Sequence, residues 1–147
     1  MNSIMTLGFR GEALAAIASV SDMRIISKTA DAPFGAVLEA QGGEIVSLTE
    51  LGCSTGTSVI VEDLFANVPA RRKFLKKDVT ESMAVTANVE KIALSHPDIA
   101  LKYISDGEVK FRTVGNGELS DTMYALFGRD FANNMYSVED EQRGIPQ

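Results

Sequence analysis

Hydrophobic and polar residues alternate over several short stretches of the chain, and turn residues bound each stretch. Alternation with a period of two predicts β-strands that are buried on one face. Gly42-Gly43 and Asp106-Gly107 each separate two such stretches, and these dipeptides favour tight hairpin turns with positive φ angles. The expected strands are 23–29, 36–41, 44–49, 58–65, 99–105 and 108–114. This succession of strands and turns indicates an antiparallel or mixed sheet.

Other segments have the composition or periodicity of helices. Residues 12–19 are rich in alanine and apolar on nearly all sides, so this helix is expected to be buried. A short helix follows Asn67, the predicted N-cap, with Pro69 in its first turn. An amphipathic helix is expected at 119–127, stopped by Gly128.

The longest predicted helix begins at Asp78 and runs to about Ser95. Asp78 is the expected N-cap, and Glu81, three residues on, completes a capping box. Its apolar stripe consists of Val85, Val89 and Ile92.

The composition limits the kinds of protein that this chain represents. A length of 147 residues suits one domain or one domain with a piece of another, and 45% apolar residues suffice for a core. The net charge of −6 argues against nucleic-acid binding through the overall field of the chain. Cys53 and His96 are the sole residues of their types, which excludes an internal disulfide and disfavours a structural zinc site. The sequence has no pattern of a membrane span or a secretion signal.

The first chemical signal is the glycine-flanked stretch Leu7 to Leu14. Gly8 and Gly11 stand on either side of Arg10, immediately before the alanine-rich helix. A glycine turn that leads into a helix N-terminus presents unpaired backbone N–H groups, which bind anions such as phosphate. Arg10 adds a fork that grips phosphate or pairs with a carboxylate. The alternative, ordinary loop chemistry, remains open on these residues alone.

A basic run follows the strand predicted at 58–65. One interpretation is a solvated helix end that balances nearby acids. The other is a surface that contacts DNA phosphates. Binding of that kind does not depend on the DNA sequence and weakens as the salt concentration rises. The run consists of Arg71, Arg72, Lys73, Lys76 and Lys77.

Two stretches together resemble one protein family, the MutL DNA mismatch-repair proteins. Gly8-Phe9-Arg10-Gly11-Glu12-Ala13-Leu14 is similar to the third ATP-binding motif of that family. Gly56 to Leu75 is similar to the fourth, with Asn67-Val68-Pro69-Ala70-Arg71 and Lys73-Phe74-Leu75 in place. Asn-x-Pro-Ala-Arg followed by Lys-Phe-Leu disfavours the chaperone and gyrase branches of the same ATPase superfamily.

The resemblance implies the GHKL ATPase fold, of α/β class: an α+β two-layer sandwich in which helices back a mixed, largely antiparallel sheet. Residues 1–115 then correspond to the C-terminal part of the ATPase domain, and 116–147 to the beginning of a transducer domain. In this fold ATP lies under a mobile lid. The positions that match the nucleotide site are Gly8, Arg10, Gly11, Glu12, Ala13 and Leu14 near the phosphates, and Thr57 near the nucleotide.

The same comparison implies that essential parts of the ATPase lie outside this sequence. The family's first motif supplies a water-activating glutamate and a Mg²⁺-binding asparagine, and its second supplies an adenine-binding aspartate. All precede the third motif, and a lysine that reaches the γ-phosphate comes from the transducer domain. We therefore expect no catalytic residue and no metal ligand in this chain, and no ATP turnover by the chain alone. Glu12 suits the helix dipole or a pair with Arg10 better than a role as general base.

The resemblance also implies the setting of the complete protein. It would be an intracellular, in bacteria cytoplasmic, homodimer that binds ATP with Mg²⁺ and acts on mismatched DNA with a mismatch-recognition protein of the MutS family. A non-catalytic fragment or scaffold that binds a protein partner without nucleotide is the alternative. Without the upstream elements, one face of the sheet is expected to expose apolar surface and to cause self-association.

Overall fold

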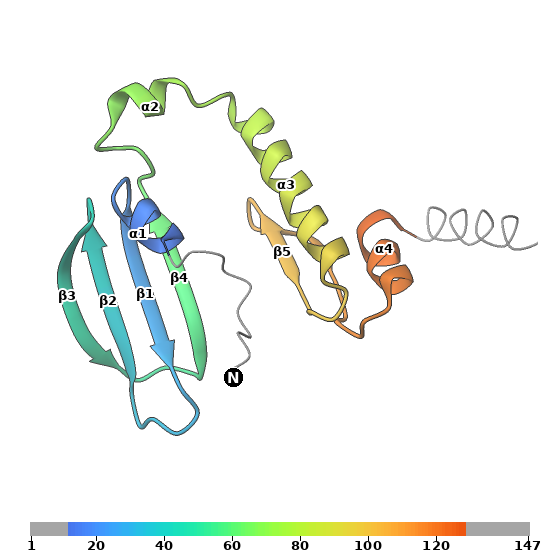
Figure 1. Cartoon of the computed structure of the whole chain (residues 1–147), viewed down its shortest axis with the longest axis horizontal. Helices are drawn as coiled ribbons and strands as arrows, with labels where there is room; N and C mark the ends of the chain where they lie inside the picture. The colour runs from blue at the N-terminus through green and yellow to red at the C-terminus, as the bar shows by residue number, and fades with distance from the viewer. Residues whose placement is uncertain (1–11, 129–147) are drawn as a thin grey trace, which may run out of the picture. The chain divides into compact units, whose positions relative to one another are not determined.

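The computed structural model describes residues 12–128, which fall into two compact units. The first unit ends at Leu75 and the second begins at Lys76. Each unit is a layer of antiparallel strands with helices (Figure 1). No helix within residues 12–128 is long and apolar enough to cross a membrane.

A four-stranded antiparallel sheet forms the first unit, in the order β3-β2-β1-β4. Its strands are β1 (Asp22–Lys28), β2 (Gly35–Gln41), β3 (Glu44–Leu51) and β4 (Gly56–Glu62). Gly42 and Gly43 take φ angles of 57° and 91° in the β2–β3 turn, which confirms the predicted hairpin. The expected strand at 58–65 ends earlier, at Glu62, because Asp63 and Phe65 adopt positive φ angles of 53° and 62°.

The two faces of this sheet differ in chemistry. Residues directly opposite each other in an antiparallel ladder point to the same face. Ile25 pairs with Leu38 and with Val59, and Leu38 pairs with Leu48, so one face is apolar. The other face is mixed: Arg24 Nε lies 3.3 Å from Glu39 Oε1, and Ile26 pairs with Val37 on the same side.

The apolar face is largely uncovered, as the sequence predicts. Within residues 12–128, Leu48 is 67% exposed, Val59 47% and Val61 41%. Met23 and Ala40, at one end of the same face, are buried.

Helix α1 (Ala13–Ala18) lies against β1 (Figure 1). The expectation that this helix is buried is wrong: none of its residues is buried, and Leu14 is 48% and Ile17 38% exposed. The physical reason is that β1 is the main neighbour of α1 among the described residues, so no second described element covers its apolar side chains.

Helix α2 (Pro69–Lys73) follows β4 after a short loop. Pro69 occupies its first position, as predicted, since a missing N–H costs nothing there. The predicted cap is wrong: Val68 is the N-cap and no side chain caps the helix. The Asn67 amide instead donates to the Ser19 carbonyl oxygen at 3.0 Å.

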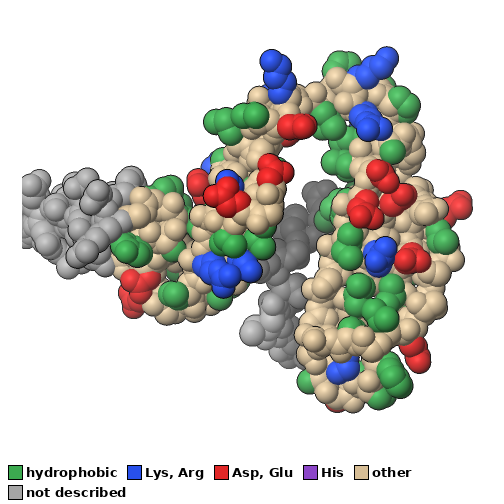
Figure 2. Space-filling model, turned by 180° about the vertical axis from the view of Figure 1, so that it is seen from behind, with side chains coloured by type: hydrophobic (Ala, Val, Ile, Leu, Met, Phe, Trp, Pro, Cys, Tyr) green, Lys and Arg blue, Asp and Glu red, His purple; other side chains and the backbone are tan. Residues whose placement is uncertain are grey.

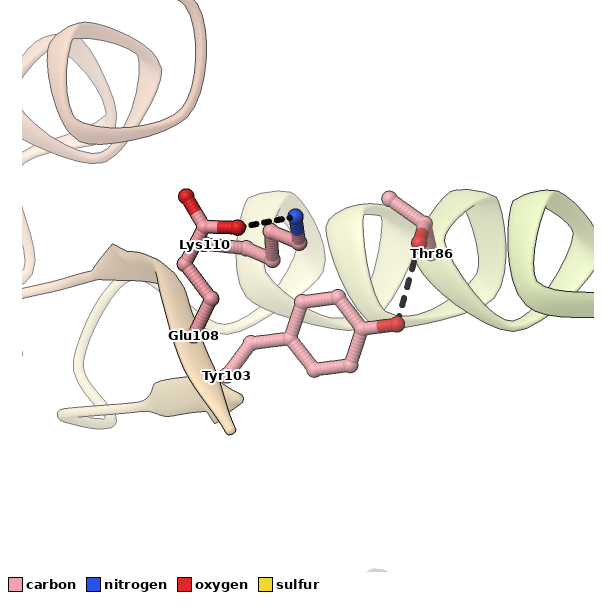
Figure 3. Close-up of polar contacts among 4 residues, drawn as sticks. All are labelled: Thr86, Tyr103, Glu108 and Lys110. Carbon is pink, nitrogen blue, oxygen red and sulfur yellow. Dashed lines mark hydrogen bonds and ion pairs between the residues drawn. The ribbon is translucent and has the colours of Figure 1, made fainter. Parts of the chain in front are cut away.

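The second unit consists of α3 (Asp78–Ser95), the hairpin β5 (Lys102–Ser105) and β6 (Glu108–Arg112), and α4 (Leu119–Phe127). Asp106 and Gly107 have φ angles of 51° and 77°, and Gly128 follows α4, so the hairpin and the helix end are confirmed. The rings of Tyr103 and Phe111 contact each other at a tilt of 45°, with centroids 5.5 Å apart. The Tyr103 hydroxyl also lies 3.0 Å from Thr86 Oγ1 on α3 (Figure 3).

The start of α3 differs by one residue from the prediction. Lys77 is the N-cap and Asp78 is the first helical residue. Glu81 Oε1 accepts the backbone N–H of Lys76 at 2.9 Å, so its carboxylate satisfies a donor outside the helix. Of the predicted stripe, Val85 and Ile92 are exposed, at 51% and 52%, and Val89 is half-buried.

Candidate nucleotide and DNA site

The predicted phosphate-binding residues lie partly outside the described residues. Gly8, Arg10 and Gly11 fall within 1–11, whereas Glu12, Ala13 and Leu14 are described. Glu12 is the N-cap of α1, with φ −97° and ψ −14°, and its carbonyl oxygen accepts the N–H of Ala16 at 3.0 Å. The Glu12 side chain makes no capping hydrogen bond.

Thr57 lies near the start of β4, opposite Ser27. The two hydroxyl oxygens are 2.8 Å apart and both are at the surface. Because either oxygen can be the donor, Thr57 can turn its hydrogen toward Ser27 or keep it for another acceptor. The sequence gives no signal for the contact between Thr57 and Ser27, because it arises from the pairing register of β1 and β4.

The structure does not bring Thr57 together with the described start of α1. Ser27 and Thr57 pair near one end of β1, whereas α1 leads into Asp22 at the other end (Figure 1). The four residue steps along the strand from Met23 to Ser27 span about 13 Å.

Three members of the basic run, Arg71, Arg72 and Lys73, occupy α2 and are exposed. Lys and Arg side chains protrude from this segment in Figure 2. Cations near a helix C-terminus interact favourably with its dipole. The Arg71 guanidinium carbon also lies 5.9 Å from the centre of the Phe65 ring, within the range of a cation–π contact.

Lys76 and Lys77 belong to the second unit, where they precede α3. Among residues 12–128, the two ion pairs are Arg24–Glu39 and Lys110–Glu108, so none of the five predicted basic residues pairs with a described acid. Their charges are therefore free to meet an anionic partner.

Other features of the described residues lie apart from these positions. A hollow of about 470 Å³ is bordered by α3, β6 and α4, and a smaller one of about 150 Å³ lies over β1 and β2. Neither is lined by a residue predicted to bind ATP or DNA. No group of three acidic, histidine or cysteine side chains within 12–128 suits a metal ion.

One carboxyl group in the first unit is electrostatically perturbed. A hydrogen bond from the Thr29 side chain, and a second from the backbone N–H of Asp31 itself, hold the pKa of Asp31 below its ordinary value of 3.8. Asp31 lies in the β1–β2 turn and is fully exposed, so the effect concerns that turn and not the predicted site.

Comparisons with known proteins agree with this architecture. The chain is 46% identical over 143 residues to the DNA mismatch repair protein MutL of Thermoanaerobacter pseudethanolicus. The aligned residues are 97% of this chain and 23% of that protein. It is 50% identical over 143 residues to MutL of Caldanaerobacter subterraneus subsp. tengcongensis, with 97% and 24% covered. The chain thus spans about a quarter of the length of these relatives.

A solved structure, the Aquifex aeolicus MutL ATPase domain in complex with ADP, superposes with a TM-score of 0.74. The two share 33% sequence identity, and the superposed region is 80% of this chain and 49% of the solved one. No family model matches the chain. The antiparallel sheet with its helices is the fold of these GHKL ATPase domains. On the identity to MutL along nearly its whole length and on this shared fold, the chain belongs to the MutL family of DNA mismatch repair proteins.

Proposed function

We propose that this chain is the phosphate-binding and lid portion of an ATPase domain in a longer MutL-type protein. The observation that carries the proposal is its structural match to an ATPase domain that holds ADP. In the complete protein, ATP binding would order the lid, bring two N-terminal domains together, and signal to DNA and to a MutS-type partner.

Within that site, the glycine turn and the start of α1 would hold the phosphates. Backbone N–H groups of the turn supply donors, and Arg10 adds charge. Thr57 would hold the nucleotide through the hydroxyl that now meets Ser27. The proposed ATP-binding residues are Gly8, Arg10, Gly11, Glu12, Ala13, Leu14 and Thr57.

The chain alone is proposed to be inactive toward ATP. Phosphoryl transfer depends on a metal ion and an oriented water. The Mg²⁺ ligands and the general base would come from other parts of the longer protein. Incubation of the purified chain with ATP and Mg²⁺ should therefore release phosphate no faster than ATP hydrolyses in buffer alone. Steady release above that rate would contradict the proposal.

The basic run is proposed to contact DNA phosphates. The test replaces Arg72 and Lys76 with glutamate in the complete protein and measures DNA affinity against salt concentration. Each lost phosphate contact should lower the slope of log affinity against log salt by about one. The matched control replaces Lys91 and Arg112, which are exposed in the second unit, with glutamate. DNA affinity that is unchanged at low salt in the Arg72/Lys76 variant rejects this role.

The proposed domain boundary lies at Gly115-Asn116-Gly117, with the ATPase part before it and the transducer part after it. The alternative function, a scaffold that binds a protein without nucleotide, is favoured by the exposed apolar face of the first sheet. A nucleotide titration separates the two. If the chain is part of an ATPase, it should bind nucleotides weakly and only through their phosphates. If it is a scaffold, it should bind no nucleotide.

A further inference from the structure

The junction between α1 and β1 is held by an unusual set of hydrogen bonds. Ser19, Val20 and Ser21 connect the helix to the strand, and their three consecutive carbonyl oxygens each accept a donor from elsewhere in the first unit. Asn67 Nδ2 donates to Ser19 at 3.0 Å, and the Phe65 N–H donates to Val20 at 2.7 Å. The Gly42 N–H donates to Ser21 at 3.2 Å.

Two of these donors come from one loop, residues 63–68, which we call the junction loop. Its conformation is costly, because Asp63 and Phe65 both have positive φ angles without being glycine. Such a conformation persists only where its surroundings hold it. The bonds to Ser19 and Val20 provide that hold.

The junction loop leads without a break into α2. The Val68 N–H donates to the Phe65 carbonyl oxygen at 3.0 Å, and the Arg71 N–H donates to the Val68 carbonyl oxygen at 3.0 Å. The Arg71 guanidinium lies over the Phe65 ring. These contacts form a continuous path from the C-terminal end of α1 through the junction loop to α2.

From this geometry we infer that Asn67 is a positioning residue that couples α1 to α2, and thereby the proposed phosphate-binding start of α1 to the basic side chains of α2. The inference rests on the proposed function for the identity of the two sites. The inference requires that α1 take different positions with and without nucleotide, and coupling between two binding sites is reciprocal. Asn67 acts through Ser19 and touches neither ligand. Because a carbonyl oxygen only accepts, the amide must present its NH₂ group to Ser19.

Amide hydrogen exchange of the chain as it stands tests the physical link. In Asn67→Ala, the amides of α1 and of α2 should both exchange about two- to tenfold faster, the range expected for the loss of one hydrogen bond. Asn67→Asp should be more severe than Asn67→Ala, because a carboxylate would face the Ser19 carbonyl oxygen. Asn88→Ala is the matched control, since Asn88 is an exposed asparagine of α3. Faster exchange in α2 alone, in neither helix, or equally in the control overturns the link.

DNA affinity of the complete protein, measured with and without ATP, tests the coupling. In Asn67→Ala the effect of ATP on DNA affinity should shrink about two- to tenfold, while DNA affinity without nucleotide stays within about twofold of the unsubstituted protein. A merely structural role would lower DNA affinity equally in both conditions, and that result contradicts the inference. If the unsubstituted protein binds neither ATP nor DNA, the proposed function fails, and the exchange experiment still decides whether Asn67 links the two helices.

Discussion

Individual residues set the local properties of the β1–β2 turn. Asp31 has a pKa below 3.8 because of the Thr29 hydrogen bond and its own backbone N–H. A carboxyl group whose pKa is lower in the folded state stabilises that state at pH values above its unfolded pKa. This contribution is lost as the pH falls from 3.8 through the folded pKa, and it is absent at still lower pH.

Replacement of Thr29 by valine removes the first of these hydrogen bonds. We expect the pKa of Asp31 to rise toward 3.8, because the ionised form loses a donor. Carboxyl chemical shifts recorded over an NMR titration give this pKa directly. Thr55→Val, at another exposed threonine of the same unit, is the control and should leave Asp31 unchanged. An Asp31 pKa that does not move in Thr29→Val contradicts the assignment of its cause.

Alanine substitutions at two glycines of the second unit distinguish the cost of backbone strain from the cost of a steric clash. Gly107 and Gly115 have φ angles of 77° and 70°, so alanine is strained at both. A Cβ at Gly107 would meet no atom within 4 Å, whereas at Gly115 it would lie 2.5 Å from the Ala100 backbone nitrogen. We expect Gly107→Ala to cost about 1–2 kcal/mol in the free energy of unfolding. Gly115→Ala should cost clearly more, because backbone has to move, and equal losses in urea unfolding would count against this packing.

At the scale of helices and strands, the sequence predicts most of the fold. The alternation of apolar residues places the strands within three residues of their observed ends, and Gly42-Gly43 and Asp106-Gly107 mark both hairpins. Two N-caps are among the misplaced features. Asn67 and Asp78 have the right chemistry for an N-cap, but Val68 and Lys77 occupy those positions. For Asn67 the reason is a tertiary contact, since its amide donates to the Ser19 carbonyl oxygen. Capping propensity reflects only the residues close to Asn67 in sequence. It cannot predict a hydrogen bond to Ser19, which is 48 positions away.

The candidate site is predicted less completely than the fold. The glycine motif and the basic run are visible because each is contiguous in sequence. The Ser27–Thr57 pair and the three donors to the α1–β1 junction join residues from different elements. A single sequence carries no signal for such contacts, because they depend on strand register and on the path of the junction loop.

At the scale of the whole molecule, the exposed apolar face of the first sheet is the dominant feature. Its uncovered residues include Leu48, Val59 and Val61, and apolar surface of this kind drives association. The chain spans about a quarter of its MutL relatives, so the cover for this face is expected from the remainder of a longer protein. The chain alone should therefore self-associate.

Lysine in place of Leu48 and threonine in place of Val61 should shift the chain toward monomer, because both changes reduce the apolar area offered to a second copy. Sedimentation velocity over a range of concentrations measures this shift. The matched control is Thr49→Lys, because Thr49 lies next to Leu48 on β3 and points to the opposite face. A chain that is already monomeric at high concentration, or an equal effect of the control, argues against association through the apolar face.

We propose that this chain holds the phosphate-binding part of a nucleotide site without the adenine-binding part. The most direct measurement is an NMR titration of the chain with adenosine, ADP and ATP, which follows the amides of residues 8–14. We expect weak binding in which ADP and ATP shift these amides and adenosine does not. Arg10→Ala should abolish the shifts, and Arg112→Ala should preserve them. Equal shifts with adenosine, or no shift with ATP at any concentration, would contradict it.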